Sequence, residues 1–151
     1  MKLKNIFLLM AMVLSAFSAS SQTFELRHDH SNILVSDLEA SALFYKNILN
    51  LKELETPWGK NPKTRFFSIG NNRQIHMVQA DKESIVINKI LHLAFNVKDF
   101  EAYLQFLKKK GIEYFNFSGG KYEIQLRPDG VKQIYFQDPD GNWIEVNDSE
   151  Y

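Results

Sequence analysis

The chain has 151 residues, with 18 basic and 18 acidic side chains, four histidines and no cysteine. This length suits one ordinary domain or two small modules that share a core, and the balanced charge offers no basic surface for nucleic acid. The absence of cysteine excludes disulfide scaffolds, thiolate zinc sites, iron–sulfur clusters and thiol nucleophiles, so any bound metal must have nitrogen and oxygen ligands.

The first 21 residues have the pattern of a secretory signal peptide. Lys2 and Lys4 precede an apolar run over residues 6–14, and small residues follow as far as Ser21. The run is shorter than the roughly 20 residues that a membrane span requires. We therefore expect cleavage near Ser21, no stable membrane insertion afterwards, and a mature protein of residues 22–151 that is exported to the periplasm or secreted.

Two amphipathic helices are predicted, each directly after a strand-like segment. In the first, Ser36 and Glu39 have the spacing of a capping box, and apolar residues recur at helical spacing over residues 38–49. In the second, Asp99 is a candidate N-cap for a helix that ends before Gly111. Each helix is expected to cover one face of a sheet.

Short strand-like runs follow each helix and are separated by turn residues. They lie at residues 51–55, 64–69 and 73–79 in the first half, and at 112–117, 122–126, 132–137 and 143–146 in the second. Each half is thus a strand, a helix and about three strands. Because neither half is long enough for a substantial core of its own, we expect an α+β fold in which two such modules, at about residues 24–80 and 88–148, pack together.

The two halves repeat one another, and the repeat relates most of the histidines. His30 aligns with His92 at the start of each half, and His76 aligns with Glu145 in the last strand of each half. A lone histidine in a strand is usually a packing or surface residue. Two repeat-related pairs of nitrogen and oxygen donors instead favour a shared metal site near the pseudo-twofold axis of two modules.

Several segments carry a family resemblance. They are Asp29-His30, Val35-Ser36-Asp37-Leu38-Glu39, Phe44-Tyr45-Lys46-Asn47-Ile48-Leu49, His92-Leu93-Ala94-Phe95 and Phe136-Gln137-Asp138-Pro139-Asp140-Gly141-Asn142-Trp143-Ile144-Glu145. Together they resemble the vicinal oxygen chelate superfamily, which includes glyoxalase I, extradiol dioxygenases and bleomycin-resistance proteins. The resemblance covers residues 24–148 and implies two paired βαβββ modules that form a curved mixed sheet around a central cavity. Family members pair these modules within one chain or across a homodimer, and the sequence leaves both open.

The resemblance also implies ligands for a divalent metal ion. His30 and His92 match the first-strand ligands of the two modules, and Glu145 matches the last-strand carboxylate ligand. His76 stands where glyoxalase I has a glutamate, so only Glu145 remains as a carboxylate that can move a substrate proton. Zinc, nickel, manganese and iron all suit such a set of donors.

The implied function is a metal-dependent glyoxalase-like enzyme, a lyase or isomerase, in which two adjacent oxygens of a small substrate bind the ion. Two alternatives stay open. His30, His92 and Glu145 with iron(II), and with His76 as an acid–base group, would suit an extradiol-type dioxygenase. A metal-free chain would suit a small-molecule-binding protein of the bleomycin-resistance type. Export argues against glutathione adducts as substrates, because the thiol pool that they need is cytosolic.

Four further residues are weaker candidates for substrate contacts. Trp58 lies in a predicted loop from which it could cover a cavity, and Arg65, Arg127 and Tyr135 could bind an anionic group. Ordinary packing or surface roles fit each of them as well. The sequence contains no P-loop, dinucleotide glycine fingerprint, nucleophile elbow or zinc-protease helix motif.

Overall fold

The fold is seen in a computed structural model that describes residues 25–56, 59 and 63–150. The predicted signal peptide and the candidate Trp58 lie outside the described residues. Within the described ranges, none of the helices is both long enough and apolar enough to span a bilayer.

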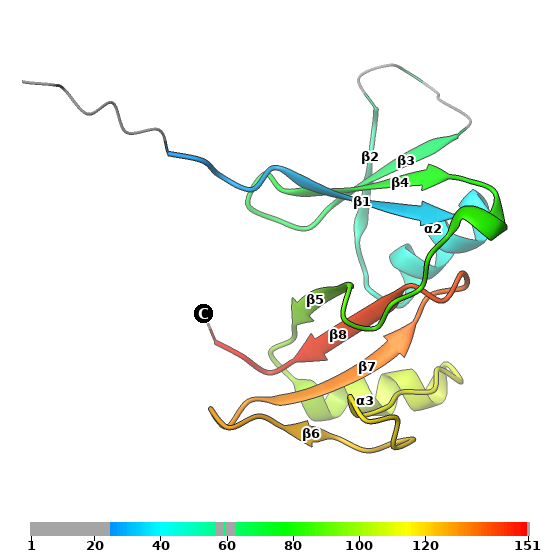
Figure 1. Cartoon of the computed structure of the whole chain (residues 1–151). Coiled ribbons are helices and arrows are strands. Elements are labelled where there is room, and N and C mark those ends of the chain that lie inside the picture. The colour runs from blue at the N-terminus through cyan, green and yellow to red at the C-terminus, as the bar shows by residue number, and fades with distance from the viewer. Residues whose placement is uncertain (1–24, 57–58, 60–62, 151) are drawn as a thin grey trace, which may run out of the picture.

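The chain forms two modules with the same order of elements (Figure 1). Module one contains β1 (His30–Val35), α2 (Leu38–Asn47), β2 (Lys52–Leu54), β3 (Thr64–Ser68) and β4 (Gln74–Gln79). Module two contains β5 (His92–Asn96), α3 (Phe100–Lys109), β6 (Gln125–Leu126), β7 (Lys132–Gln137) and β8 (Trp143–Asn147). A linker, residues 80–91, joins them and includes the short 3₁₀ helix η1 (Lys82–Ser84). The predicted α+β fold of two βαβββ modules is confirmed.

Each module has a four-stranded mixed sheet, and the two sheets have equivalent strand orders. The orders are β1-β4-β3-β2 and β5-β8-β7-β6, with one parallel pair in each, β1 with β4 and β5 with β8. The first strand of each module is therefore an edge strand. Neither β1 nor β5 pairs with a second strand in the part of the chain that the structure describes.

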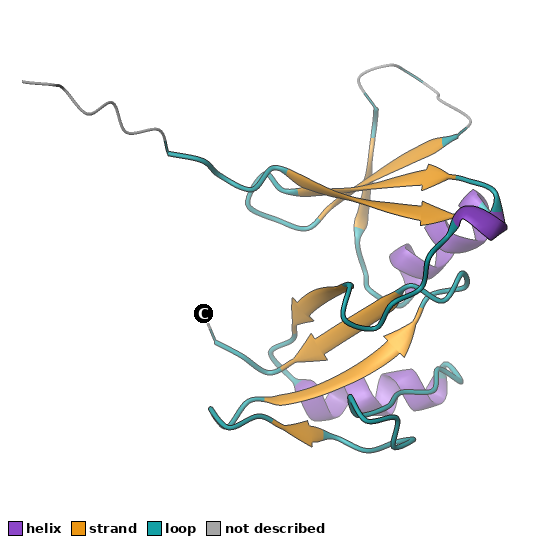
Figure 2. Cartoon of the chain, viewed as in Figure 1, coloured by secondary structure: helices purple, strands orange, loops and turns teal. Residues whose placement is uncertain are grey.

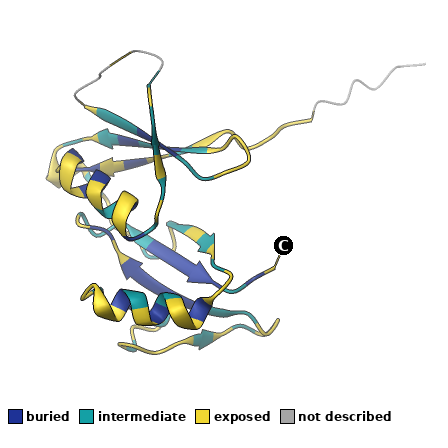
Figure 3. Cartoon of the chain, turned by 180° about the vertical axis from the view of Figure 1, so that it is seen from behind, coloured by how far each residue is buried: buried dark blue, intermediate teal, exposed yellow. Residues whose placement is uncertain are grey.

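Alternation along the strands turns one face of each sheet toward the core. In module one, Val35, Phe67 and Met77 are fully buried on this face, and in module two Ile134 and Ile144 are. Helices α2 and α3 cover these faces, and Figure 3 shows the burial concentrated in β7 and β8. Because side chains alternate, His30, His76, His92 and Glu145 all lie on the outer faces, away from the helices.

Helix α2 begins one residue later than the capping-box pattern predicts. The side chain of Asp37, not Ser36, caps the helix by accepting from the backbone amides of Glu39 at 3.1 Å and Ala40 at 3.0 Å. Ser36 instead donates its backbone amide and its hydroxyl to Asp140 in the other module. The predicted cap at Ser36 is thus wrong, because a carboxylate one residue along accepts the same bonds. The predicted cap at Asp99 is confirmed by its bond from the amide of Ala102 at 2.9 Å.

The turn between β7 and β8, residues 138–142, joins the two modules. Asp138 is buried and accepts a hydrogen bond from the hydroxyl of Tyr45 on α2 at 3.3 Å. The side-chain amide of Asn142 donates to the carbonyl of Leu34 on β1 at 3.0 Å. These bonds hold α2 and the end of β1 against module two, and Figures 1 and 3 both show α2 between the two sheets.

One stretch of module two departs from the prediction. Residues 112–117 form no strand and contribute only single bridges at Phe115, and the strand predicted at 122–126 shortens to β6 (Figure 2). The side chain of Asn116 closes a turn by accepting from the amide of Gly120 at 2.7 Å. Tyr122 has a φ of 58°, which a strand does not allow.

Candidate metal centre

The four predicted donor side chains form two separate pairs, one in each module. The imidazole rings of His30 and His76 lie parallel, with centroids 4.0 Å apart and planes inclined by 13°. In module two, Nε2 of His92 lies 3.3 Å from Oε2 of Glu145. Within the described residues, no three histidine, aspartate or glutamate side chains come together as a metal site. One chain therefore presents two half-sites, which we call the module-one pair and the module-two pair.

A carboxylate fixes the ring of His30. Its Nδ1 lies 2.6 Å from Oδ2 of Asp29, and this hydrogen bond lowers the pKa of Asp29 below its ordinary value. Because a carboxylate only accepts, Nδ1 carries the proton and donates it. The lone pair of His30 is therefore on Nε2, where it can bind an ion.

His76 is the middle ring of a stack. Phe66 lies on its other face, with centroids 3.7 Å apart, and Nε2 of His76 donates to Oε1 of Gln74 at 2.9 Å. Burial, and then the neighbouring His30, lower the pKa of His76, so the ring is neutral at pH 7. A lone pair lies in the plane of its imidazole ring, and these two planes are stacked and nearly parallel, so the lone pairs of His30 and His76 do not converge on one ion.

A backbone carbonyl fixes the ring of His92. Nδ1 of His92 donates to the carbonyl of Lys89 at 2.8 Å, which places the lone pair on Nε2, facing Glu145. Glu145 is only 7% exposed, and its carboxylate accepts from the Tyr135 hydroxyl at 2.6 Å and from the Asn147 amide at 2.8 Å. Nε2 and Oε2 are both acceptors in this state, and a proton or a metal ion between them would satisfy both.

Tyr135 remains a hydrogen-bond donor over the physiological pH range. Burial, and then the hydrogen bond to Glu145, raise the pKa of the Tyr135 phenol well above its ordinary value. A neutral phenol that donates to a buried carboxylate stabilises the ionised form of that carboxylate.

In both half-sites, the Nδ1–H of a histidine donates a hydrogen bond to a nearby oxygen, which leaves the Nε2 lone pair free to bind an ion. Proteins commonly orient metal-binding histidines in this way. The donors available to an ion are then Nε2 of His30, Nε2 of His92 and the carboxylate of Glu145. This set fits a divalent first-row ion. Sequence reasoning missed Asp29 and Lys89; the carboxylate next to His30 was a visible signal, whereas a backbone carbonyl has none.

The weaker candidates for substrate contacts do not lie together. Arg65 pairs with Glu53 at 3.3 Å and also with Glu39, and Arg127 pairs with Asp129 at 2.5 Å. Of the described candidates for substrate contacts, Tyr135 is the one that the fold brings into hydrogen-bonding contact with a predicted ligand.

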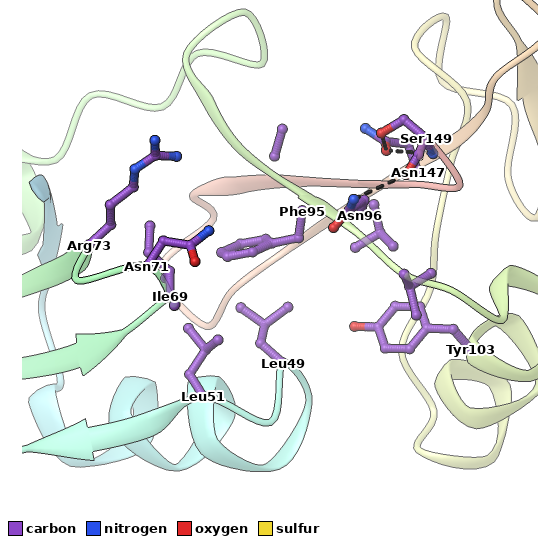
Figure 4. Close-up of a pocket in the computed structure, with 14 residues that line it drawn as sticks. Leu49, Leu51, Ile69, Asn71, Arg73, Phe95, Asn96, Tyr103, Asn147 and Ser149 are labelled. Carbon is purple, nitrogen blue, oxygen red and sulfur yellow. Dashed lines mark hydrogen bonds between the residues drawn. The ribbon is translucent and has the colours of Figure 1, made fainter. Parts of the chain in front are cut away.

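Two cavities lie beside module two, and one of them is lined by a member of the module-two pair. A cavity of about 560 Å³ between the modules has apolar walls such as Leu49 and Phe95, and one wall includes Asn147, which holds Glu145 (Figure 4). A smaller cavity of about 320 Å³ lies between β1 and the start of β5, and His92 and Trp143 line it. The smaller cavity contains one of the predicted metal ligands and lies between the two edge strands.

Comparisons with known proteins agree with this fold. Residues 27–146 match the sequence model of the Glyoxalase/Bleomycin resistance protein/Dioxygenase superfamily. The metallothiol transferase FosB of Staphylococcus epidermidis is 31% identical over 125 residues, which are 79% of this chain and 79% of that protein. A glyoxalase family protein from Bacillus anthracis has a TM-score of 0.68 at 25% identity, over 85% of this chain and 99% of its own. The oxidase ChaP-H2 has a TM-score of 0.69 at 24% identity, over 85% and 97% of the two chains, and shows likeness in fold.

Proposed function

Because the chain belongs to the glyoxalase/bleomycin resistance protein/dioxygenase superfamily, we propose that it is a metal-dependent enzyme of the glyoxalase type. Its substrate is a small molecule with two adjacent oxygen atoms. The observation that carries this proposal is the matched anchoring of His30 and His92, each of which donates Nδ1–H to a fixed acceptor and leaves Nε2 free.

The proposed ligands are His30, His92 and Glu145. A divalent ion bound by these residues would supply Lewis-acid polarisation of the two substrate oxygens. Tyr135 and Asn147 hold the carboxylate of Glu145 in place through one hydrogen bond to each oxygen. Three protein ligands leave coordination positions open for the substrate.

The proposed proton-transfer group is His76. Its Nε2 already donates to Gln74, and its pKa is lowered, so a neutral imidazole offers the Nδ1 lone pair beside His30. Glu145 suits this task less well, because both of its oxygens accept hydrogen bonds. His76 would take a proton from the substrate carbon and return it to the neighbouring carbon or oxygen, as general acid–base catalysis requires.

We further propose that a second copy of the chain completes the metal site. Among the residues that the structure describes, the two half-sites are separate, and the strands that carry His30 and His92 are each paired on one side only. The linker also exposes apolar side chains: Val86 is 84% exposed, Ile90 72% and Leu91 73%. A homodimer in which module one of each chain meets module two of the other would unite the pairs and cover this apolar segment.

Metal analysis of the untagged mature protein tests the ligand set. We expect about one ion per chain, and loss of metal in the His30→Gln, His92→Gln and Glu145→Gln variants. His28→Gln is the matched control, since His28 lies two residues before His30 and contacts Ser31 instead. His76→Gln should keep the metal and lose turnover. Less than about 0.1 ion per chain, after addition of zinc, nickel, manganese or iron, would instead indicate a metal-free binding protein.

Subunit mixing tests the shared site. Homodimers of His30→Gln and of His92→Gln each lack a complete site. A mixed dimer contains one complete site and one that lacks both histidines, so exchange of the two variants should restore about a quarter of the wild-type metal content. No recovery in a preparation shown to contain mixed dimers would place both histidines of each site in one chain.

A second function shares the same three ligands. Two histidines and one carboxylate are also the ligands of non-haem iron(II) oxygenases. Anaerobic loading with iron(II), followed by addition of catechol and oxygen, distinguishes the two. Oxygen consumption coupled to ring opening would favour an extradiol-type dioxygenase over the isomerase or lyase.

Export of the mature chain also remains a proposal, supported by the pattern of residues 1–21. Expression of the full sequence in a bacterial host, with fractionation and intact-mass measurement, tests it. A periplasmic product that begins between residues 19 and 23 is expected, and a full-length cytosolic product would contradict it.

A further inference from the structure

Lys89 lies in an aromatic cage next to the module-two pair. Its Nζ is 4.4 Å from the ring centroid of Trp143, 4.9 Å from that of Tyr135 and 5.4 Å from that of Phe117. The same nitrogen donates to the backbone carbonyls of Asn116 at 2.7 Å and Phe117 at 2.9 Å. Three rings and two carbonyls around one ammonium group are more than a surface lysine needs.

Lys89 also contacts His92 directly and is linked to Glu145 through Tyr135, one of the rings of the cage. The backbone carbonyl of Lys89 accepts the Nδ1 proton of His92. The ring of Tyr135 forms one wall of the cage, while its hydroxyl donates to Glu145. Lys89 is otherwise part of the exposed linker, between Asn88 and Ile90. Locally, the amides of Ile90 and Leu91 close a turn on the side-chain oxygen and carbonyl of Asn88. The caged ammonium attaches this turn to module two and so fixes the Lys89 carbonyl in front of His92.

We propose that Lys89 is the positioning residue of the module-two pair: its caged ammonium anchors the end of the linker, so that its carbonyl sets the tautomer of His92. This inference rests on the proposed metal site, because it concerns which nitrogen of a ligand is free. A neutral imidazole without a fixed partner populates both tautomers, and one of them carries its proton on Nε2, where the ion must bind. Loss of the anchor therefore weakens metal binding without removal of any ligand.

Lys89→Met tests this, since methionine keeps an unbranched apolar side chain and removes the charge. The tautomer of His92 is read from the ¹⁵N resonances of its ring in the metal-free protein, over a series of increasing pH values that ends where the resonances show a neutral ring. The wild type should show only Nδ1–H, and Lys89→Met a mixture of both tautomers. Affinity for zinc, measured by chelator competition, should fall by roughly 10- to 100-fold.

Two further variants complete the test. Lys89→Arg keeps a cation that stacks on aromatic rings and should restore the single tautomer. Lys110→Met is the matched control, because Lys110 also lies over a ring, that of Phe106 at 5.6 Å, but at the end of α3. It should leave both the tautomer and the zinc affinity unchanged.

The outcomes separate this inference from the proposed function. A single Nδ1–H tautomer with wild-type zinc affinity in Lys89→Met would overturn the role of Lys89, as would equal behaviour of Lys89→Met and Lys89→Arg. Tautomer mixing in a protein that binds no metal would support the positioning role and refute the metal site. If Lys89→Met does not fold, Phe117→Leu removes one half-exposed cage wall, and a smaller shift in the same direction is then expected.

Discussion

The bond between His30 and Asp29 decides which nitrogen of that histidine faces outward. Asp29 is exposed and precedes β1, so its side chain adds little to the core. Replacement of Asp29 by alanine removes the acceptor of the Nδ1 proton and frees the ring to rotate. We expect metal affinity to fall by roughly 10- to 100-fold while the thermal unfolding temperature stays the same.

Calorimetric titration with zinc, together with thermal unfolding, measures both effects. Glu25→Ala is the control, because Glu25 is an exposed carboxylate in the same segment that pairs with Arg27. Unchanged zinc affinity in Asp29→Ala would show that the stack on His76 alone orients His30.

Tyr135 has a structural role that can be separated from metal binding. Tyr135→Phe keeps the ring and removes the donor to Glu145, so a buried carboxylate loses one of its two hydrogen bonds. We expect the metal-free protein to lose about 1–3 kcal/mol of unfolding free energy. Urea denaturation measures this, with Tyr122→Phe, a half-exposed tyrosine, as control. An unchanged midpoint for Tyr135→Phe would contradict the role given to its hydroxyl.

At the scale of residues, the sequence predicted donor types and their places in the repeat. Residue type and alternation suffice to put His30, His76, His92 and Glu145 on one face of their strands. The partners of these side chains depend on tertiary contacts. The carbonyl of Lys89 reaches His92 through a bend in the linker, and no pattern of residue types reports a backbone carbonyl.

At the scale of elements, the ring stack of module one follows from strand register. Phe66 and His76 are directly opposite on the antiparallel strands β3 and β4. On the parallel strand β1, Asn32 is opposite His76, and His30 lies two residues before Asn32 on the same face of the sheet. Apart from β6 and the stretch at 112–117, the strands after each helix were predictable within one residue, because period-two alternation is a local signal. The pairing of β1 with β4 joins segments far apart in the chain, and a local pattern cannot specify it.

In the stretch at 112–122, the local pattern predicts a strand that the structure does not form. Alternating aromatic residues, Phe115 and Phe117, have the composition of a strand. The chain turns instead, because the Asn116 side chain satisfies the backbone amide of Gly120 and replaces a ladder bond. Phe117 thereby comes to lie against Tyr135 in the cage of Lys89.

The β7–β8 turn gives a pH-dependent contribution to stability. Burial raises the pKa of Asp138 above its ordinary value of 3.8, although bonds from Asn142 oppose this. The folded chain thus binds this proton more tightly than the unfolded chain does. The contribution of Asp138 to the unfolding free energy is therefore greatest below pH 3.8 and declines as the pH rises through the raised pKa.

Asp138→Asn tests this contribution, because asparagine has a similar shape and no proton to lose. We expect the unfolding free energy of the wild type, relative to the variant, to decrease from acidic toward neutral pH. Urea titrations at a series of pH values measure the difference. A difference that is constant or increases with pH would contradict the raised pKa.

At the scale of the whole molecule, the exposed linker predicts an interface. Ile90→Lys combined with Leu91→Lys puts charge into the apolar segment that a second copy would cover. We expect a folded monomer that has lost most of its metal, since each half-site then lacks its counterpart. Light scattering with metal analysis measures both, and Leu26→Lys, at a side chain that is 93% exposed outside the linker, is the control. A monomer with full metal content would contradict a site shared between chains.

The repeat predicted a pseudo-twofold relation and a pair of donors in each half, but not how the halves meet. Two equivalent modules satisfy the same symmetry within a chain or between chains. Two contacts determine how the modules pack. Phe44 on α2 lies against Phe136 on β7, and the hydroxyl of Tyr103 on α3 donates to the carbonyl of Ile48 at the end of α2. Such contacts depend on side-chain shape in three dimensions and have no periodic signal.

The joint between the modules makes the two halves unequal in their tolerance of change. Asp140 accepts from Ser36 and Ser41 of module one. The repeat-related turn of module one, residues 70–73, has no carboxylate with which to return such a bond. A substitution in the turn of module two therefore removes hydrogen bonds between the modules, whereas one in the turn of module one removes no such bond to a carboxylate of its own. A duplicated fold can thus keep its donor residues at symmetrical positions while only one copy has the turn that bonds to the other module. The equivalent turn of the other copy is then freer to change in sequence.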